Sequence, residues 1–107
     1  MSSLQALAGY SALAHPLRLA LFRELSARAP LSAPAGELAT KLGTPPSTMT
    51  GHLQTLERAG LIKAKRRARY RLYSLDPTGV QYLIEYLTSD CLGGRLEKLL
   101  SLSDEPV

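Results

Sequence analysis

The sequence of residues 35–59 predicts two short helices joined by a tight turn. Gly43 is expected to end the first helix in a left-handed conformation, which glycine adopts without strain. Thr44 and Pro45 follow directly, and they suit the cap and the first position of a second helix, because proline needs no N–H donor there. Gly60 then ends the second helix. These closely spaced helix ends constrain the fold more than any other feature.

The remaining elements are predicted from apolar spacing and from the positions of proline and glycine. We expect three further helices over about residues 2–13, 16–27 and 77–90, a proline-rich connector over 29–35, two strands over about 61–66 and 69–75, a short extra helix at 95–102, and a disordered tail from residue 103. The predicted fold is a single domain over residues 1–107, mainly α-helical with a small β-hairpin.

Three local signals refine this prediction. His15 is expected to start a helix rather than to bind a ligand, and Asp76 is expected to cap the final helix, which ends at Gly93 and Gly94. The hairpin tip near Ala68 lacks the Asn-Gly or Asp-Gly pair that favours a tight turn, so the strand register stays open.

Positive charge is concentrated in one short segment. Residues 58–71 contain seven of the thirteen lysines and arginines and none of the nine acidic residues. The segment is therefore +7, while the rest of the chain is −3. Such a concentration is the electrostatic signature of a protein that binds a polyanion.

The second helix of the pair has a polar face opposite its apolar one. At about 100° per residue, Met49, Leu53 and Leu56 lie on the side expected to face the core. The opposite side has no acidic and no large apolar residue, and it consists of Ser47, Gly51, Gln54 and Arg58, flanked by Thr48, Thr50 and Thr55. Glutamine pairs with the edge of adenine, and serine or threonine with several bases or with phosphate. The pattern favours a helix in the major groove of double-stranded DNA; the alternative is an ordinary amphipathic helix with a solvated face.

The basic hairpin is expected to form a wing beside that helix. Its cations are Lys63, Lys65, Arg66, Arg67, Arg69 and Arg71. They could straddle phosphates, with the arginines of the tip in the minor groove, and binding would then depend steeply on salt. The alternative is a charged edge hairpin that resists aggregation, although six positive charges without a carboxylate nearby exceed that need.

Composition excludes several other classes of protein. With Cys91 as its one cysteine the chain can form no internal disulfide, which favours a reducing cytoplasm. No signal peptide and no membrane span are predicted. No glycine-rich phosphate loop, catalytic histidine motif or metal-ligand cluster is present, so we expect neither an enzyme nor a bound cofactor.

Four stretches of the chain carry a more specific pattern: AHPLRLALFREL, GELATKLGTPPSTMTGHLQTLERAGLI, YRLYSLDP and YLIEYLTSDCLGG. Over about residues 14–94 they resemble the ArsR/SmtB family of winged-helix repressors. The resemblance implies a homodimer, built on the first and last helices, that binds an inverted repeat in a promoter and leaves it when an inducer binds. It also implies which residues read the DNA, namely Ser47, Thr48, Thr50, Gly51 and Gln54.

The same resemblance places His52 at the family's usual histidine. Its position beside the core face indicates packing, or a bond to backbone or phosphate, rather than base contact. Two metal-ligand sets of the family are missing. Where some members have ELCVCDL this chain has ELATKL, without a thiolate, and of the zinc positions on the last helix Asp76 is present while Thr78, Ser89 and Leu92 occupy the others. No metal site is expected.

The end of the chain is most similar to arsenite-sensing members with YLTxDCCGGxPELC. Cys91 matches the first thiol, Leu92 replaces the second, and Leu99 stands near the third. Three-coordinate arsenic needs three sulfurs, and one thiol per chain cannot supply them. Cys91 has three interpretations: a small apolar residue at a helix end, a redox or electrophile sensor, or a ligand for a partly substituted arsenical.

A DNA-binding repressor is not the sole function compatible with this fold. A winged helix can also serve as a protein–protein interaction module. Such a module should present an exposed apolar or aromatic patch in place of a polar recognition face.

Overall fold

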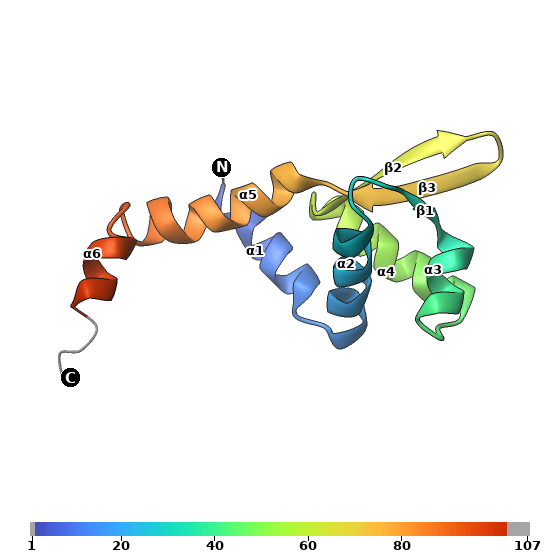
Figure 1. Cartoon of the computed structure of the whole chain (residues 1–107), viewed down its shortest axis with the longest axis horizontal. Coiled ribbons are helices and arrows are strands. Elements are labelled where there is room, and N and C mark those ends of the chain that lie inside the picture. Colours follow the sequence, from blue (N-terminus) through green and yellow to red (C-terminus); the bar gives the residue numbers. More distant parts are fainter. Residues whose placement is uncertain (1, 103–107) are drawn as a thin grey trace.

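The computed structural model describes residues 2–102, so the expectation for the tail from residue 103 falls outside the described residues. Its elements are α1 (Ser3–Leu13), α2 (Pro16–Arg28), β1 (Ala33–Pro34), α3 (Ala35–Lys41), α4 (Pro46–Arg58), β2 (Ile62–Arg67), β3 (Tyr70–Leu75), α5 (Pro77–Glu85), the π-helical turn η1 (Tyr86–Cys91) and α6 (Leu96–Ser101). Figure 1 shows the helix pair α3–α4 and the hairpin β2–β3 at one end, while α5, η1 and α6 extend toward the other. The molecule is mainly helical with a small antiparallel sheet.

The predicted helix pair is confirmed, with one shift at its turn. Gly43 has a φ of 59°, in the left-handed region, as expected for the end of α3. The second helix begins at Pro46, one residue later than predicted, and Pro45 occupies the cap without a side-chain bond. A residue before proline is kept out of the helical region, which explains why Pro45 has a ψ of 140°. The Thr44 hydroxyl donates instead to the carbonyl of Leu42, at 3.1 Å.

The sheet has three strands rather than two. β1, within the predicted connector, pairs antiparallel with β3, so that Ala33 faces Tyr73 and Pro34 faces Leu72. A two-residue strand gives no periodic pattern, and proline is tolerated because β1 is an edge strand. The β2–β3 register, which the sequence left open, pairs Arg67 with Tyr70. Ala68, next in the turn, has a φ of 54°, a conformation usually left to glycine or asparagine.

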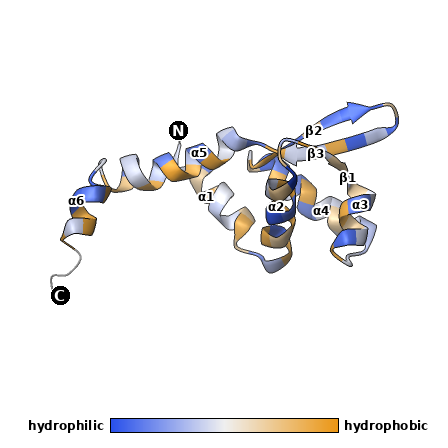
Figure 2. Ribbon diagram, in the orientation of Figure 1, coloured by the Kyte–Doolittle hydropathy of each residue, from blue (hydrophilic) through white to orange (hydrophobic). Residues whose placement is uncertain are grey.

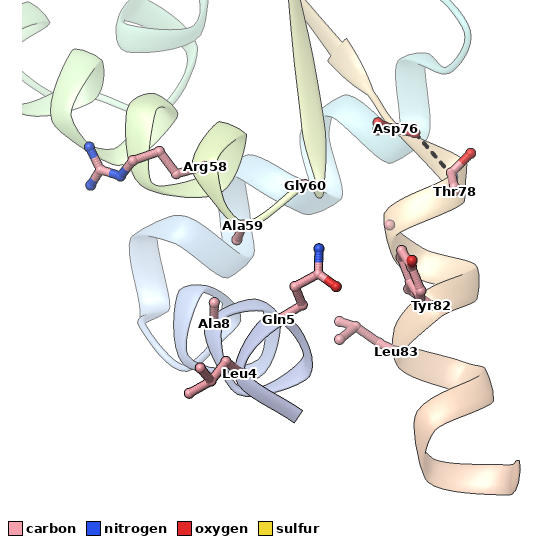
Figure 3. A pocket seen from close by; sticks show the side chains of 11 residues that line it. Leu4, Gln5, Ala8, Arg58, Ala59, Gly60, Asp76, Thr78, Tyr82 and Leu83 are labelled. Carbon is pink, nitrogen blue, oxygen red and sulfur yellow. Dashed lines mark hydrogen bonds between the residues drawn. The ribbon is translucent and has the colours of Figure 1, made fainter. Parts of the chain in front are cut away.

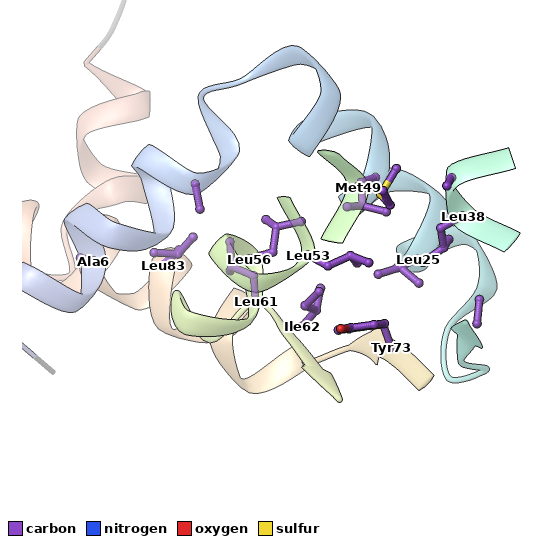
Figure 4. Close-up of a cluster of buried hydrophobic side chains, with 14 residues drawn as sticks. Ala6, Leu25, Leu38, Met49, Leu53, Leu56, Leu61, Ile62, Tyr73 and Leu83 are labelled. Atoms are coloured by element: carbon purple, nitrogen blue, oxygen red, sulfur yellow. The ribbon is translucent and has the colours of Figure 1, made fainter. Parts of the chain in front are cut away.

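The core lies between α2, α3, α4 and the sheet, and it continues to the contact of α1 with α5 (Figure 4). Met49, Leu53 and Leu56 are fully buried, as predicted for the inner face of α4. They share the core with Leu21, Leu25, Leu38, Leu61, Ile62 and Tyr73.

None of the helices in the described part of the chain is long and apolar enough to cross a membrane.

The final helix begins as predicted but does not continue regularly to residue 90. Asp76 Oδ1 accepts the Thr78 N–H at 3.1 Å, which confirms the cap. At Tyr86 the helix widens into η1. The Thr88 hydroxyl donates to the Ile84 carbonyl at 2.8 Å, which is the acceptor that the Thr88 N–H would use in an α-helix. Gly93 and Gly94, both with positive φ, then end the helix as expected.

Two glycines let α5 approach the rest of the fold closely. A Cβ atom on Gly79 would lie 1.8 Å from the Gly60 carbonyl oxygen, and one on Gly9 would lie 2.7 Å from the Leu83 side chain. The Asp76 N–H also donates to the Leu61 carbonyl at 3.0 Å. The start of α5 is therefore fixed against the turn that follows α4.

Candidate nucleic-acid interface

The outer face of α4 is exposed along its whole length. The residues predicted to read bases, together with Arg58 at the end of the helix, are all exposed: Ser47, Thr48, Thr50, Gly51, Gln54 and Arg58. A Cβ atom on Gly51 would find no atom within 4 Å, so this position forms an open notch in the face. A partner surface can approach the helix backbone most closely there.

Two threonines of this face already use their hydroxyl protons. Thr50 Oγ1 donates to the Pro46 carbonyl at 3.0 Å, and Thr55 Oγ1 donates to the Gly51 carbonyl at 3.1 Å. Each hydroxyl keeps its acceptor lone pairs, so in this conformation it can accept from a base amino group but not donate. Sequence spacing did not indicate this, because it depends on the side-chain rotamer.

His52 lies half-buried beside the core face of α4, which agrees with the predicted packing role. Its ring centroid is 4.7 Å from that of His15, and Arg18 Nη1 lies 3.4 Å from His52 Nδ1. Burial lowers the pKa of His52 from its ordinary value of 6.5, and the neighbouring His15 and Arg18 lower it further. His15 caps α2 as predicted, since its Nδ1 accepts the Leu17 N–H at 3.2 Å.

Arg18 was not among the predicted functional residues, yet it connects three helices. Besides its approach to His52 on α4, its Nε donates to the Ala12 carbonyl of α1 at 2.7 Å. Nothing in the local pattern distinguished Arg18 from other surface arginines of α2. The contact arises from tertiary packing, and it positions α4 relative to the first two helices.

The wing extends past the helical body (Figure 1). Five of its cations are exposed on β2 or in the turn, namely Lys63, Lys65, Arg66, Arg67 and Arg69. None of these five is in an ion pair with another residue between 2 and 102. The register pairs Arg66 with Arg71 and Arg67 with Tyr70, which gathers the arginines at the tip. Like charges held together without partners favour an external anion.

The sixth cation corrects one expectation. Arg71 Nη2 lies 2.8 Å from Glu57 Oε2, so the wing does have a carboxylate nearby. Glu57 precedes the basic segment by one residue in sequence, and the fold of the β2–β3 hairpin onto α4 brings it to Arg71. The hydrogen bond to Glu57 raises the pKa of the Arg71 guanidinium above its ordinary value. This ion pair joins the wing to α4, and it leaves Arg71 less available than the other cations.

Tyr70 is a wing residue that charge analysis missed. The Arg69 guanidinium carbon lies 5.5 Å from the centre of its ring, and Tyr70 itself is 53% exposed. With Arg66, Arg69 and Arg71 it lines a depression of about 90 Å³ near the wing tip. An exposed ring beside arginines can pack against sugar or base, and its position next to the turn could have suggested this.

The other candidate residues do not belong to the outer face of α4 or to the wing. Cys91 is exposed at the end of η1, so the interpretation of a buried structural thiol does not fit the single chain. Asp76 is engaged as the cap of α5. Among residues 2–102 there is no group of three or more histidine, cysteine and acidic residues placed to hold a metal ion.

A large apolar surface is exposed elsewhere, on α1, α5, η1 and α6. It comprises Leu4, Leu7, Tyr82, Ile84, Leu87, Leu96, Leu99, Leu100 and Leu102. The hydropathy colouring shows orange segments along these helices and blue ones on much of the wing (Figure 2). The apolar patch expected of a protein-binding module is thus present, but it is separate from the polar face of α4.

Comparison with known proteins agrees with this geometry. A family model described as a helix-turn-helix domain matches residues 13–63. Among solved structures, HlyU from Vibrio cholerae N16961 is 30% identical, with 80% of this chain and 90% of that chain covered and a TM-score of 0.64. No curated protein matches the sequence closely enough to count as a relative.

Two further structures are similar in fold. An ArsR-like transcriptional regulator from Rhodococcus sp. RHA1 is 20% identical, covering 92% of this chain and 89% of that one, with a TM-score of 0.73. The homodimeric winged helix-turn-helix DNA-binding domain of Mb0332 from Mycobacterium bovis is 23% identical, covering 80% and 79%, with a TM-score of 0.64.

Proposed function

Because this chain belongs to the ArsR/SmtB family of winged helix-turn-helix transcriptional regulators, we propose that it is a homodimeric repressor whose α4 helices enter successive major grooves of an inverted-repeat operator. The observation that carries the proposal is the pairing of two surfaces. An exposed, acid-free polar face on α4 lies beside a wing with five cations that form no ion pair with any residue of the described range 2–102.

In the proposed complex the two surfaces have different tasks. Gln54, Ser47 and Thr48 contact base edges, and the notch at Gly51 admits the groove wall or a base. The wing cations contact phosphates, with Arg66, Arg67 and Arg69 supplying affinity that does not depend on sequence. The Glu57–Arg71 ion pair orients the wing relative to α4.

The homodimer is supported by the exposed apolar surface of α1, α5, η1 and α6. A patch of this kind is costly to leave in water, and a second copy of the chain offers a matching one under two-fold symmetry. The similar domain from Mycobacterium bovis is described as homodimeric. Two copies would present two recognition helices, and therefore a palindromic site.

An inducer at Cys91 forms part of the proposal. The thiol is exposed, so an arsenical or an oxidant can reach it. One thiol per chain provides two in a dimer, which is fewer than trivalent arsenite needs, so a monosubstituted arsenical or an oxidant is the better candidate. Replacing Cys91 with serine should abolish release by such reagents while leaving DNA binding in their absence unchanged.

The function is tested by fluorescence anisotropy on labelled duplexes from the region upstream of the protein's own reading frame, titrated over a range of salt. Specific binding with a steep salt dependence is expected. The triple variant R66A/R67A/R69A should weaken binding to every duplex and flatten the salt dependence. Q54A should instead reduce the preference for the specific duplex.

Lys98→Ala is the matched control, because it removes a cation from α6, at the opposite end of the molecule from the wing (Figure 1). It should leave both the affinity and the salt slope unchanged. Identical behaviour of the triple variant and Q54A would contradict the proposed division between helix and wing. Absence of binding to any duplex would contradict the repressor and favour the interaction module.

A further inference from the structure

A cavity of about 370 Å³ lies between the start of α1, the end of α4 and the start of α5 (Figure 3). This volume falls in the lower part of the range for pockets that hold small organic molecules. The wing and Cys91 do not line the cavity, whereas Arg58 also belongs to the outer face of α4, and Leu4 and Tyr82 also belong to the exposed apolar surface.

The lining is apolar with a few polar groups. Leu4, Ala8, Leu83 and the ring of Tyr82 supply the apolar surface. In the close-up the Gln5 side chain points into the space between α1 and α5, whereas the Arg58 side chain points away (Figure 3).

The charged group that belongs to the cavity is therefore the Asp76 carboxylate. One of its oxygens accepts the Thr78 N–H, and ionised carboxylates are acceptors only, with room for a further donor. A bound molecule must accordingly bring a donor, and a positive charge on it would be favoured over a negative one.

The walls are preformed on two sides. Gly79 lies against the Gly60 carbonyl and fixes α5 to the turn after α4, with no space for a Cβ atom between them. Gly9 on α1 lies against Leu83, and the Tyr10 hydroxyl donates to the Leu83 carbonyl, so α1 is attached to α5 at the far end of the cavity. The N-terminal turns of α1 form a third side, where Leu4 is 78% exposed, so the cavity is open to solvent there.

We propose that this cavity binds a small aromatic amine, with its ring between Leu4, Ala8 and Tyr82 and its ammonium group at Asp76. The cavity wall includes Arg58, Ala59 and Gly60, the last residue of the recognition helix and the turn that leads to the wing. A molecule held there contacts α1, α5 and the end of α4 at once. Binding in the cavity is thereby coupled to the position of the recognition helix, a consequence that rests on the proposed function.

Tryptamine is the probe, with indole-3-acetate as an anion of similar shape and 3-methylindole as a neutral ring without the amine. Binding to the full-length protein is followed by calorimetry and by amide NMR shifts. Tryptamine should bind more tightly than 3-methylindole, and indole-3-acetate most weakly. The shifts should centre on residues 4–8, 58–60 and 76–83.

Two variants test the position of the probe. Ala8→Phe fills the cavity and should abolish tryptamine binding. Asp76→Asn keeps a residue that caps helices as well as aspartate but removes the charge, so it should weaken tryptamine binding at least tenfold and leave 3-methylindole unchanged. Asp76→Asn also keeps the test decisive if Ala8→Phe fails to fold. Binding of tryptamine that neither folded variant alters would overturn the site.

DNA binding is measured separately, so that the two proposals fail in different ways. Saturating tryptamine should change the affinity for the specific duplex at least fivefold in the natural protein and in Cys91→Ser, but not in Ala8→Phe. Tryptamine binding without any such change would overturn the coupling and leave DNA binding intact. If none of the three probes binds at millimolar concentration, the site is overturned. It is also overturned if the NMR shifts change with protein dilution and not with tryptamine, because the partner chain would then fill the cavity.

Discussion

His52 is a residue of α4 whose pKa is lowered by its surroundings in the folded state. Burial, the His15 ring and the Arg18 guanidinium all lower its pKa, so His52 takes up a proton at a lower pH in the folded state than in the unfolded chain. The unfolded state then binds more protons, and stability falls as the pH decreases. We expect the free energy of unfolding to decline below about pH 6.5, and to decline less steeply in His52→Gln. Urea titrations at pH 7.5 and 5.5 measure this, and equal declines in both proteins would contradict it.

Gly79 and Gly51 form a matched pair of glycines with opposite environments. Alanine at Gly79 would place its Cβ 1.8 Å from the Gly60 oxygen, so Gly79→Ala should destabilise the fold by about 2–3 kcal/mol. Gly51 is in a helix with open space around it, and Gly51→Ala should stabilise the fold by about 0.5–1 kcal/mol. Thermal unfolding separates the two effects.

Because Gly51 is the notch of the recognition face, the same Gly51→Ala protein should bind its specific duplex more weakly, and unchanged binding would contradict that role.

The Arg71–Glu57 ion pair, on the protein surface, joins the wing to α4. Glu57→Gln removes a negative charge near the proposed DNA surface and releases Arg71. We expect tighter binding to all duplexes at low salt. The logarithm of the affinity should also fall more steeply with the logarithm of the salt concentration, by the contribution of about one phosphate contact. Stability should change by less than about 1 kcal/mol, because exposed ion pairs contribute little. Anisotropy and thermal melts on one preparation test both statements. Unchanged affinity would mean that Arg71 does not reach the DNA.

The elements also show which features a sequence can predict. The ends of α3, α4 and α5 depend on the conformations of Gly43, Gly60 and the Asp76 cap, and such local preferences are visible in the residue types. The recognition face followed from the period of one helix. By contrast, the edge strand β1, the widening at Tyr86 and the Glu57–Arg71 ion pair depend on neighbours distant in sequence or on a particular rotamer. Pattern and propensity contain no information about these contacts.

The positively charged surface and the exposed apolar surface occupy different parts of the molecule. Positive charge occupies the wing end, whereas apolar side chains are exposed along α1, α5, η1 and α6. A single copy would leave this apolar surface in water. The proposed dimer covers it and at the same time sets the separation of two recognition helices, so assembly and tight binding of the full inverted repeat should be lost together.

Ile84→Glu tests this link, because Ile84 is 56% exposed and a charge there would be buried at the proposed interface. Light scattering should give a dimer for the natural protein and a monomer for Ile84→Glu, while helix content and thermal unfolding of the monomer stay cooperative. The monomer should bind a full inverted repeat at least tenfold more weakly, yet bind a single half-site as well as the natural chain does. Gln81→Lys, an exposed charge change on the same helix outside the apolar set that keeps a donor for Glu85, is the control and should remain dimeric. A dimer that survives Ile84→Glu would place the interface elsewhere, and equal loss of half-site binding would mean that the substitution damages α4 instead of assembly.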